Sequence, residues 1–182
     1  MKNIIISIKA FIGFSIILGL FYPLAITGIA QKTMQQKANG SLITKNGRIV
    51  GSSLIGQTFD KPEYFNSRPS AVNYNASGSG ASNLGPSSKK LIERVKETIK
   101  EDKLGSKKIP ADMLLTSASG LDPHISLENA QLQSSRISKI RNIPESKIEA
   151  LIEENTDDDF IGIWGEEGVN VLKLNIALDE VK

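Results

Sequence analysis

Cysteine is absent from this 182-residue chain, and histidine occurs once, as His124. Without cysteine the chain forms neither disulfides nor thiolate metal sites, and a single histidine cannot build a histidine-rich metal site. The acidic run Asp157–Asp159 lacks the spaced oxygen ligands of a Ca²⁺ loop. We therefore expect no metal centre. The lack of cysteine fits either side of a membrane, so it does not indicate a cellular compartment.

Charged residues are absent from Ala10–Ala30, a stretch of twenty-one residues rich in isoleucine, leucine and phenylalanine. A helix of that length spans about 31 Å, which matches the hydrocarbon core of a bilayer. The stretch predicts a transmembrane helix preceded by a short N-terminal tail at 1–9. A signal peptide cleaved after Ala30 stays open as an alternative, although the apolar core of such peptides usually has only about 7–15 residues.

Acidic residues are missing before Asp60, whereas basic residues flank the apolar stretch on both sides. Lys2 and Lys9 precede it. The basic residues that follow it are Lys32, Lys37, Lys45 and Arg48. Because basic residues lie on both sides of the apolar stretch, the positive-inside rule does not decide the orientation. Because long domains translocate largely regardless of charge, an extracytoplasmic domain is permitted.

Residues 31–182 carry no net formal charge. They contain all twenty acidic residues and twenty of the twenty-two basic ones. A neutral domain gives no electrostatic reason to expect nucleic acid as a partner. The 152 residues of this part suit one domain with a buried core. The predicted fold class is α+β: a single N-terminal transmembrane helix followed by one mixed α/β soluble domain at 31–182.

The soluble part alternates between helical and strand patterns. Apolar residues at helical spacing predict helices at Ser88–Asp102, at Leu127–Arg141 and from Pro144 onward, with Asp122-Pro123 or Ser126 as a helix start. Asn46-Gly47 between β-prone segments predicts a hairpin of Ser41–Thr44 and Arg48–Leu54, where we expect the domain's sheet to start. Further strands are predicted at Asp112–Thr116 and in a C-terminal hairpin of Phe160–Trp164 and Val169–Leu174.

A glycine-rich run occupies Asn75–Gly85, within a long irregular segment at 56–88. Backbone N–H groups of such a loop can converge on a phosphate. The candidate nucleotide-binding residues are Ser77, Gly78, Gly80, Ser82, Asn83 and Gly85. However, the Lys-Ser/Thr pair of a Walker A loop is missing and no clear strand precedes the run. A packed structural loop is therefore the favoured interpretation.

The second unusual loop, Thr116–Ser126, contains His124 close to Asp122. A catalytic interpretation would pair His124 with Asp122 and a serine. Nothing in the sequence marks a nucleophile elbow or an oxyanion hole, so we expect no catalytic residues. His124 is expected to hydrogen-bond the loop.

Several blocks along the chain carry a family resemblance. They are Gly51–Gln57, Tyr64-Phe65, Arg68–Ala71, Ser82–Pro86, Ser119–Ser126, Gln133 with Arg136, Val169–Leu172, Leu174-Asn175 and Ala177–Asp179. With the N-terminal helix, these co-linear blocks resemble the C subunit of the Kdp-type potassium-transporting P-type ATPase over essentially the whole chain. One departure is Gly80-Ala81, where the family usually has two adjacent glycines.

The resemblance implies an accessory subunit of a bacterial membrane complex, whose other subunits supply the potassium-conducting pore and the ATP-hydrolysing machine. The chain lacks a DKTGT-like motif and cannot form a phosphoenzyme. K⁺ would be handled by the partner subunits, and Arg68, Asp122 and His124 lie in the family's motif loops.

The family is commonly described as a catalytic chaperone that raises ATP affinity, with Ser77–Gly85 near nucleotide, and its soluble domain is placed outside the cell. These implications conflict because ATP is cytoplasmic. Assembly and stabilisation of the complex are therefore favoured over direct ATP binding, and no firmly bound cofactor is expected. The alternative is a secreted or anchored extracytoplasmic binding module, or a hydrolase using His124.

Overall fold

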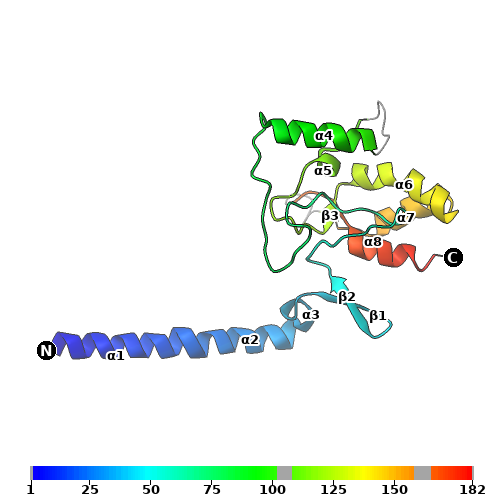
Figure 1. The fold of residues 1–182 in the computed structure, drawn as a ribbon. Helices are drawn as coiled ribbons and strands as arrows, with labels where there is room; N and C mark the ends of the chain where they lie inside the picture. The colour runs from blue at the N-terminus through cyan, green and yellow to red at the C-terminus, as the bar shows by residue number, and fades with distance from the viewer. Residues whose placement is uncertain (1, 102–107, 158–164, 182) are drawn as a thin grey trace. The chain divides into compact units, whose positions relative to one another are not determined.

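The computed structural model describes residues 2–101, 108–157 and 165–181 (Figure 1). The chain divides into two compact units, Met1–Ile43 and Thr44–Lys182. The first unit is mostly helical, and the second contains the three-stranded sheet, the remaining helices and the buried core.

A long apolar helix dominates the first unit. It consists of α1 (Lys2–Ile16), a π-helical turn η1 (Ile17–Phe21) and α2 (Tyr22–Thr33), and the short helix α3 (Gln35–Ala38) follows. None of the side chains of α1, η1 or α2 is buried. The helix is long and apolar enough to cross a membrane, with a mean hydropathy of 2.4. The predicted transmembrane segment lies within it, and the helical conformation extends upstream to Lys2.

The wide turn in this helix lies directly before Pro23. Proline has no N–H to donate to the carbonyl group four residues earlier, and its ring crowds that carbonyl. At the junction the Tyr22 N–H bonds to the Ile17 carbonyl, five residues back, as in a π-helix. The helix therefore passes the proline position without ending.

The predicted Asn-Gly hairpin is confirmed. Strands β1 (Leu42–Lys45) and β2 (Arg48–Ser52) form a two-stranded sheet. Asn46 and Gly47 have φ values of 53° and 75°, the left-handed conformation that a tight hairpin turn needs. The expectation that the domain's main sheet starts here is wrong, because the hairpin forms a sheet of its own.

The second sheet has three short antiparallel strands in the order β3-β5-β4. Strand β5 (Gly168–Asn170) lies between β3 (His124–Ile125) and β4 (Thr156–Asp157). Its central residue Val169 pairs with Ile125 on one side and with Thr156 on the other. Residues far apart in sequence are thus brought to one small sheet.

The remaining helices of the second unit are labelled in Figure 1. They are α4 (Lys89–Glu101), α5 (Ala111–Leu114), α6 (Leu127–Arg141), α7 (Glu145–Glu154) and α8 (Val171–Leu178). The predicted helices at Ser88–Asp102, at Leu127–Arg141 and after Pro144 are confirmed. Helix α6 begins at Ser126, whose hydroxyl accepts the Asn129 N–H at 3.2 Å, and it ends at Asn142 in the left-handed conformation.

Three local predictions are wrong. The expected strand at Asp112–Thr116 contains helix α5 instead, and the Asp112 carboxylate accepts three hydrogen bonds from Ser126 and Asn129. Asp122-Pro123 does not start a helix, because the Asp122 carboxylate accepts the His124 N–H and the chain continues into β3.

The third concerns Val169–Leu174, which is strand only up to Asn170 and helical afterwards. The Asn170 side chain accepts the Lys173 N–H at 3.2 Å and so caps α8. The predicted partner strand Phe160–Trp164 lies outside the described residues.

The hydrophobic core lies between α6, α7, α8 and the three-stranded sheet. Its fully buried aliphatic residues include Ile137, Ile148 and Leu174. Phe65 is also fully buried, although it belongs to the irregular segment after β2. The long loop is thus part of the core structure.

Candidate functional site

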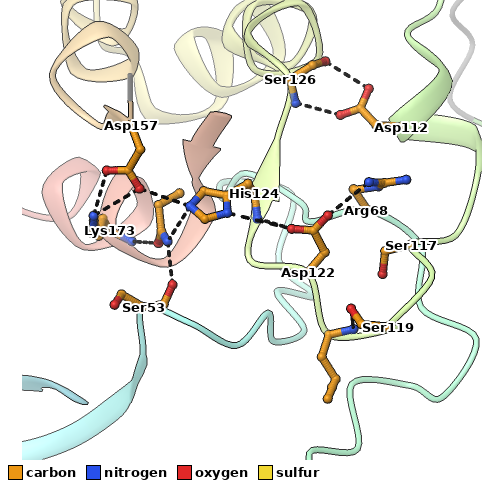
Figure 2. Close-up of polar contacts among 12 residues, drawn as sticks. Ser53, Arg68, Asp112, Ser117, Ser119, Asp122, His124, Ser126, Asp157 and Lys173 are labelled. Carbon is orange, nitrogen blue, oxygen red and sulfur yellow. Dashed lines mark hydrogen bonds and ion pairs between the residues drawn. The ribbon is translucent and has the colours of Figure 1, made fainter. Parts of the chain in front are cut away.

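His124 lies at the centre of a polar network on the three-stranded sheet (Figure 2). Its Nε2 is 3.1 Å from Asp157 Oδ2 and 3.3 Å from Asn170 Nδ2. The antiparallel register places His124 opposite Asn170, and β4 brings Asp157 to the other side of β5. With its proton on Nε2, the imidazole donates to the Asp157 carboxylate.

The Asp157 carboxylate also receives the Lys173 ammonium, 3.1 Å from Oδ1. Partial burial raises the pKa of Asp157, but hydrogen bonds from Lys173 and His124, together with their charges, lower it more. The pKa of Asp157 therefore lies below its usual value, and the carboxylate stays ionised at neutral pH.

The Asn170 amide is fixed in one orientation. Its Oδ1 accepts the Lys173 N–H, and its Nδ2 donates to the Ser53 carbonyl at 2.8 Å. This second bond fastens the end of the hairpin region to α8 within the second unit.

Arg68 and Asp122 form an ion pair at the loop side of the network, with Arg68 Nη1 3.0 Å from Asp122 Oδ2 (Figure 2). The other Asp122 oxygen accepts the His124 N–H at 3.0 Å and lies 3.9 Å from His124 Nδ1. The structure therefore brings together the three motif-loop residues that the sequence analysis selected. The backbone N–H of His124 bonds within the loop, whereas its imidazole hydrogen-bonds Asp157 and Asn170, which lie outside the loop.

A cavity of about 780 Å³ lies beside this network. His124 lines it together with the charged residues Arg68, Lys108, Asp112, Asp122, Glu128, Asp157, Glu166 and Glu167. Asp112, Asp122 and Asp157 already pair with donors of the protein itself. Within the described ranges, no cluster of histidine and acidic side chains has the arrangement of a metal site.

The chemistry available here differs from that of a hydrolase triad. The ring partners of His124 are carboxylates and an amide, and no serine hydroxyl hydrogen-bonds to it among the described residues. A triad needs the nucleophile on one ring nitrogen and the orienting carboxylate on the other. The network fastens the strands and α8 together.

The candidate nucleotide-binding residues lie apart from this cavity, and none of them lines it. The N–H groups of Ser77 and Gly78 bond to Asn75, and the Gly80 N–H donates to the Ser119 carbonyl at 2.8 Å. Ser82 Oγ is 3.2 Å from Thr116 Oγ1. Asn83 has a φ of 53°, and the Gly85 carbonyl accepts the Ser88 N–H. Three of the loop's amides are thus bonded within the protein.

The two unusual loops pack against each other at Gly120. Its φ is +68°, and a Cβ there would lie 2.7 Å from the Gly80 carbonyl oxygen and 2.6 Å from Val72. Ser70 Oγ donates to the Gly120 carbonyl at 2.6 Å. Glycine is therefore required here by both the backbone conformation and the close approach.

Comparison of the sequence with known proteins shows its family. The family model described as "KdpC: K+-transporting ATPase, c chain" matches residues 4–180. The chain belongs to this family. The potassium-transporting ATPase KdpC subunit of Koribacter versatilis (strain Ellin345) is 46% identical over 182 residues, covering 98% of this chain and 94% of that protein. The KdpC subunit of Bradyrhizobium diazoefficiens is 48% identical over 181 residues, covering 90% and 89%.

Two side-chain amides, of Gln133 and Asn175, have backbone partners that the sequence did not predict. Gln133 forms two hydrogen bonds with the backbone of Asn66, accepting its N–H at 2.8 Å and donating to its carbonyl at 3.1 Å. Asn175 does the same for Phe65, at 2.8 and 2.9 Å. Two side-chain amides thus replace the neighbouring strand that this extended segment lacks. The family blocks contain Gln133 and Asn175, but nothing in the sequence shows their partners.

Arginine side chains of α6 fasten the same segment from another side. Arg136 donates to the carbonyl groups of Pro62 and Tyr64. The Tyr64 hydroxyl donates to Asp179, and Arg141 lies over the Tyr64 ring and pairs with Asp179 at 2.9 Å. Burial raises the pKa of Asp179, but hydrogen bonds from Arg141, Tyr64 and Lys45 outweigh it, so the pKa is lowered.

Proposed function

We propose that this chain is a non-catalytic subunit of an ATP-driven potassium uptake complex, in which it assembles and stabilises the pore-forming and ATP-hydrolysing subunits. The observation that carries the proposal is the match to the KdpC family over residues 4–180, which includes the apolar helix as well as the soluble domain. Relatives that match over almost the whole chain are named as subunits of a potassium-transporting ATPase.

The apolar helix Lys2–Thr33 would anchor the subunit in a bacterial cell membrane, in contact with lipid and with the other pump subunits. Its exposed isoleucine, leucine and phenylalanine side chains suit the hydrocarbon core, which offers them an apolar solvent. We place the soluble domain on the extracytoplasmic side, since a long domain can translocate and the charges flanking the helix do not oppose it.

A catalytic-chaperone role, in which the chain raises the ATP affinity of the ATP-hydrolysing subunit, is the second candidate. It depends on the loop Ser77–Gly85 reaching nucleotide. The internal hydrogen bonds of Ser77, Gly78 and Gly80 leave fewer amides for a phosphate. An extracytoplasmic domain would also lie across the membrane from ATP. Assembly therefore remains the favoured role, with no firmly bound cofactor.

The alternative of an extracytoplasmic hydrolase using His124 gains no support from the geometry, because His124 bonds to Asp157 rather than to a nucleophile. A His124→Ala variant distinguishes the two functions. For an assembly subunit, K⁺-stimulated ATP hydrolysis by the whole pump persists as long as the variant still assembles. For a hydrolase, the chain's own activity disappears.

The test of the proposal is co-purification. A C-terminally tagged full chain, expressed with the other pump subunits, should bring both larger subunits out of detergent-solubilised membranes. A matched chain lacking residues 1–33 should not. A pump that assembles fully and hydrolyses ATP with K⁺ in the absence of this chain would contradict the proposal. A reporter fused after Lys182 tests the orientation: alkaline phosphatase should be active there and a cytoplasm-only fluorescent protein dark.

A further inference from the structure

Exposed apolar side chains are concentrated at one place in the second unit. In the segment Lys45–Ile55, Ile49 is 66% exposed, Leu54 60% and Ile55 36%. Elsewhere in the described part of this unit, large apolar side chains of comparable exposure occur singly. A group of them within seven residues indicates a surface that is covered in the assembled protein.

The same segment is basic. Acidic residues are missing from the whole chain before Asp60, whereas Lys45 and Arg48 lie in the segment itself. Arg48 is exposed and pairs with no carboxylate among the described residues. Lys45 lies 3.4 Å from Asp179, which Arg141 also neutralises. The surface thus offers positive charge next to apolar side chains.

The segment is attached to the domain at its middle, between Ile49 and Leu54. A Cβ on Gly51 would lie 2.7 Å from Leu172 of α8, so the strand touches the helix there. The Ser53 carbonyl accepts the Asn170 amide at 2.8 Å. Ile49 and Leu54, on either side of these attachments, remain exposed.

Only a short stretch of chain separates this segment from the apolar helix in sequence. Helix α2 ends at Thr33 with Lys32 in its last turn, and β1 begins at Leu42. The short connection includes the helical turn α3, which spans only about 6 Å. If the helix is anchored in the membrane, the segment emerges next to the lipid head groups.

We propose that Lys45–Ile55 is a membrane-surface contact, in which Ile49 and Leu54 enter the interfacial layer and Arg48 binds the phosphates of anionic phospholipids. This inference rests on the membrane anchoring proposed above. Surface segments bind anionic bilayers through the apolar area they bury together with the attraction of their basic side chains, and this segment offers both. With the helix, this contact gives the domain two attachments to one bilayer and thereby restricts its tilt.

The absence of cysteine allows a direct test with single labelled cysteines in the full chain. Ile49→Cys and Leu54→Cys carry an environment-sensitive fluorophore and report on the proposed contact. Ile140→Cys, 46% exposed in the native chain, is the matched control on the domain. Leu20→Cys reports separately on the anchoring of the helix. Each variant is reconstituted into nanodiscs of phosphatidylglycerol or of phosphatidylcholine.

In phosphatidylglycerol, we expect head-group spin-labelled lipid to quench the fluorophores at positions 49 and 54 at least twofold more than the one at 140. Exchange into phosphatidylcholine, or the substitution Arg48→Glu, should reduce this quenching, whereas Arg48→Lys should preserve it. Quenching by acyl-chain label at position 20 should be the same in both lipids.

The outcomes separate the inference from the function on which it rests. Quenching at 20 without quenching at 49 and 54 overturns the membrane contact and leaves the anchoring intact. No quenching at 20 overturns the anchoring and the contact together. Equal quenching in both lipids overturns the role of the anionic head group. A response at 49 and 54 that requires the other pump subunits makes the segment a protein docking surface and overturns the lipid assignment.

Discussion

Replacing Asn175 by alanine tests whether side-chain amides hold the irregular segment on the core. The Asn175 side chain is the partner of both backbone groups of Phe65, and both residues are buried. In Asn175→Ala the Phe65 N–H and carbonyl lose their partners while the Phe65 ring still fills the core.

The cost follows from these two groups. A buried backbone group left without a partner costs about 1–3 kcal/mol, so the substitution should lower the free energy of unfolding by about 2–6 kcal/mol. With a urea dependence of about 2 kcal/mol/M, the midpoint of unfolding should fall by about 1–3 M. This loss is large against the total stability of a domain, which is about 5–15 kcal/mol.

The assay is urea unfolding of the full chain in detergent micelles, followed by far-ultraviolet circular dichroism. Asn155→Ala is the matched control: the Asn155 amide donates only to Leu151, whose carbonyl keeps the Asn155 N–H as a donor. We expect this control to cost less than about 1 kcal/mol. Equal midpoints for the two variants would refute the idea that the amides hold the segment.

Three further predictions concern the second unit. Gly120→Ala should lower the thermal midpoint by several degrees because its φ is +68° and its surroundings are tight, whereas Gly78→Ala, with open space around it, should not. The pKa values of Asp157 and Asp179 are lowered in the folded state. Their contribution to stability is therefore complete above about pH 5 and is lost as the pH falls below about 4. Asp179→Asn should weaken this decrease of the melting temperature at acid pH. Millimolar ATP should leave the melting temperature of the full chain unchanged, and a clear upward shift would instead support the nucleotide loop.

Local signals in the sequence predicted the elements whose determinants are themselves local. The spacing of apolar residues predicted α4 and α6, and Asn46-Gly47 predicted the hairpin turn. Ser126 caps α6, because its hydroxyl accepts the Asn129 N–H. The failures were short segments. Ala111–Leu114 and Val171–Leu178 contain apolar runs that fit a strand as well as a helix, and capping by Asn170 decided the second.

The polar network was only partly accessible from the sequence. Asp122 and His124 are two residues apart, so their interaction is a local turn that sequence reasoning can anticipate. Asp157 and Lys173 reach His124 only through the order of the three short strands, which no local pattern specifies. For the same reason, the glycine-rich sequence predicted a loop whose backbone N–H groups could bind an anion. It did not predict that Asn75 and Ser119 accept hydrogen bonds from three of these N–H groups.

The amide anchors of the irregular segment impose an order on biosynthesis. Gln133 follows Asn66 by 67 residues, and Asn175 follows Phe65 by 110, close to the end of the chain. A ribosome makes about 5–20 residues each second, so Phe65 waits several seconds or longer for its partner. The leading helix is complete long before then. Docking of the aromatic segment on the core is therefore a late step, because it waits until Gln133 and Asn175 have both been synthesised.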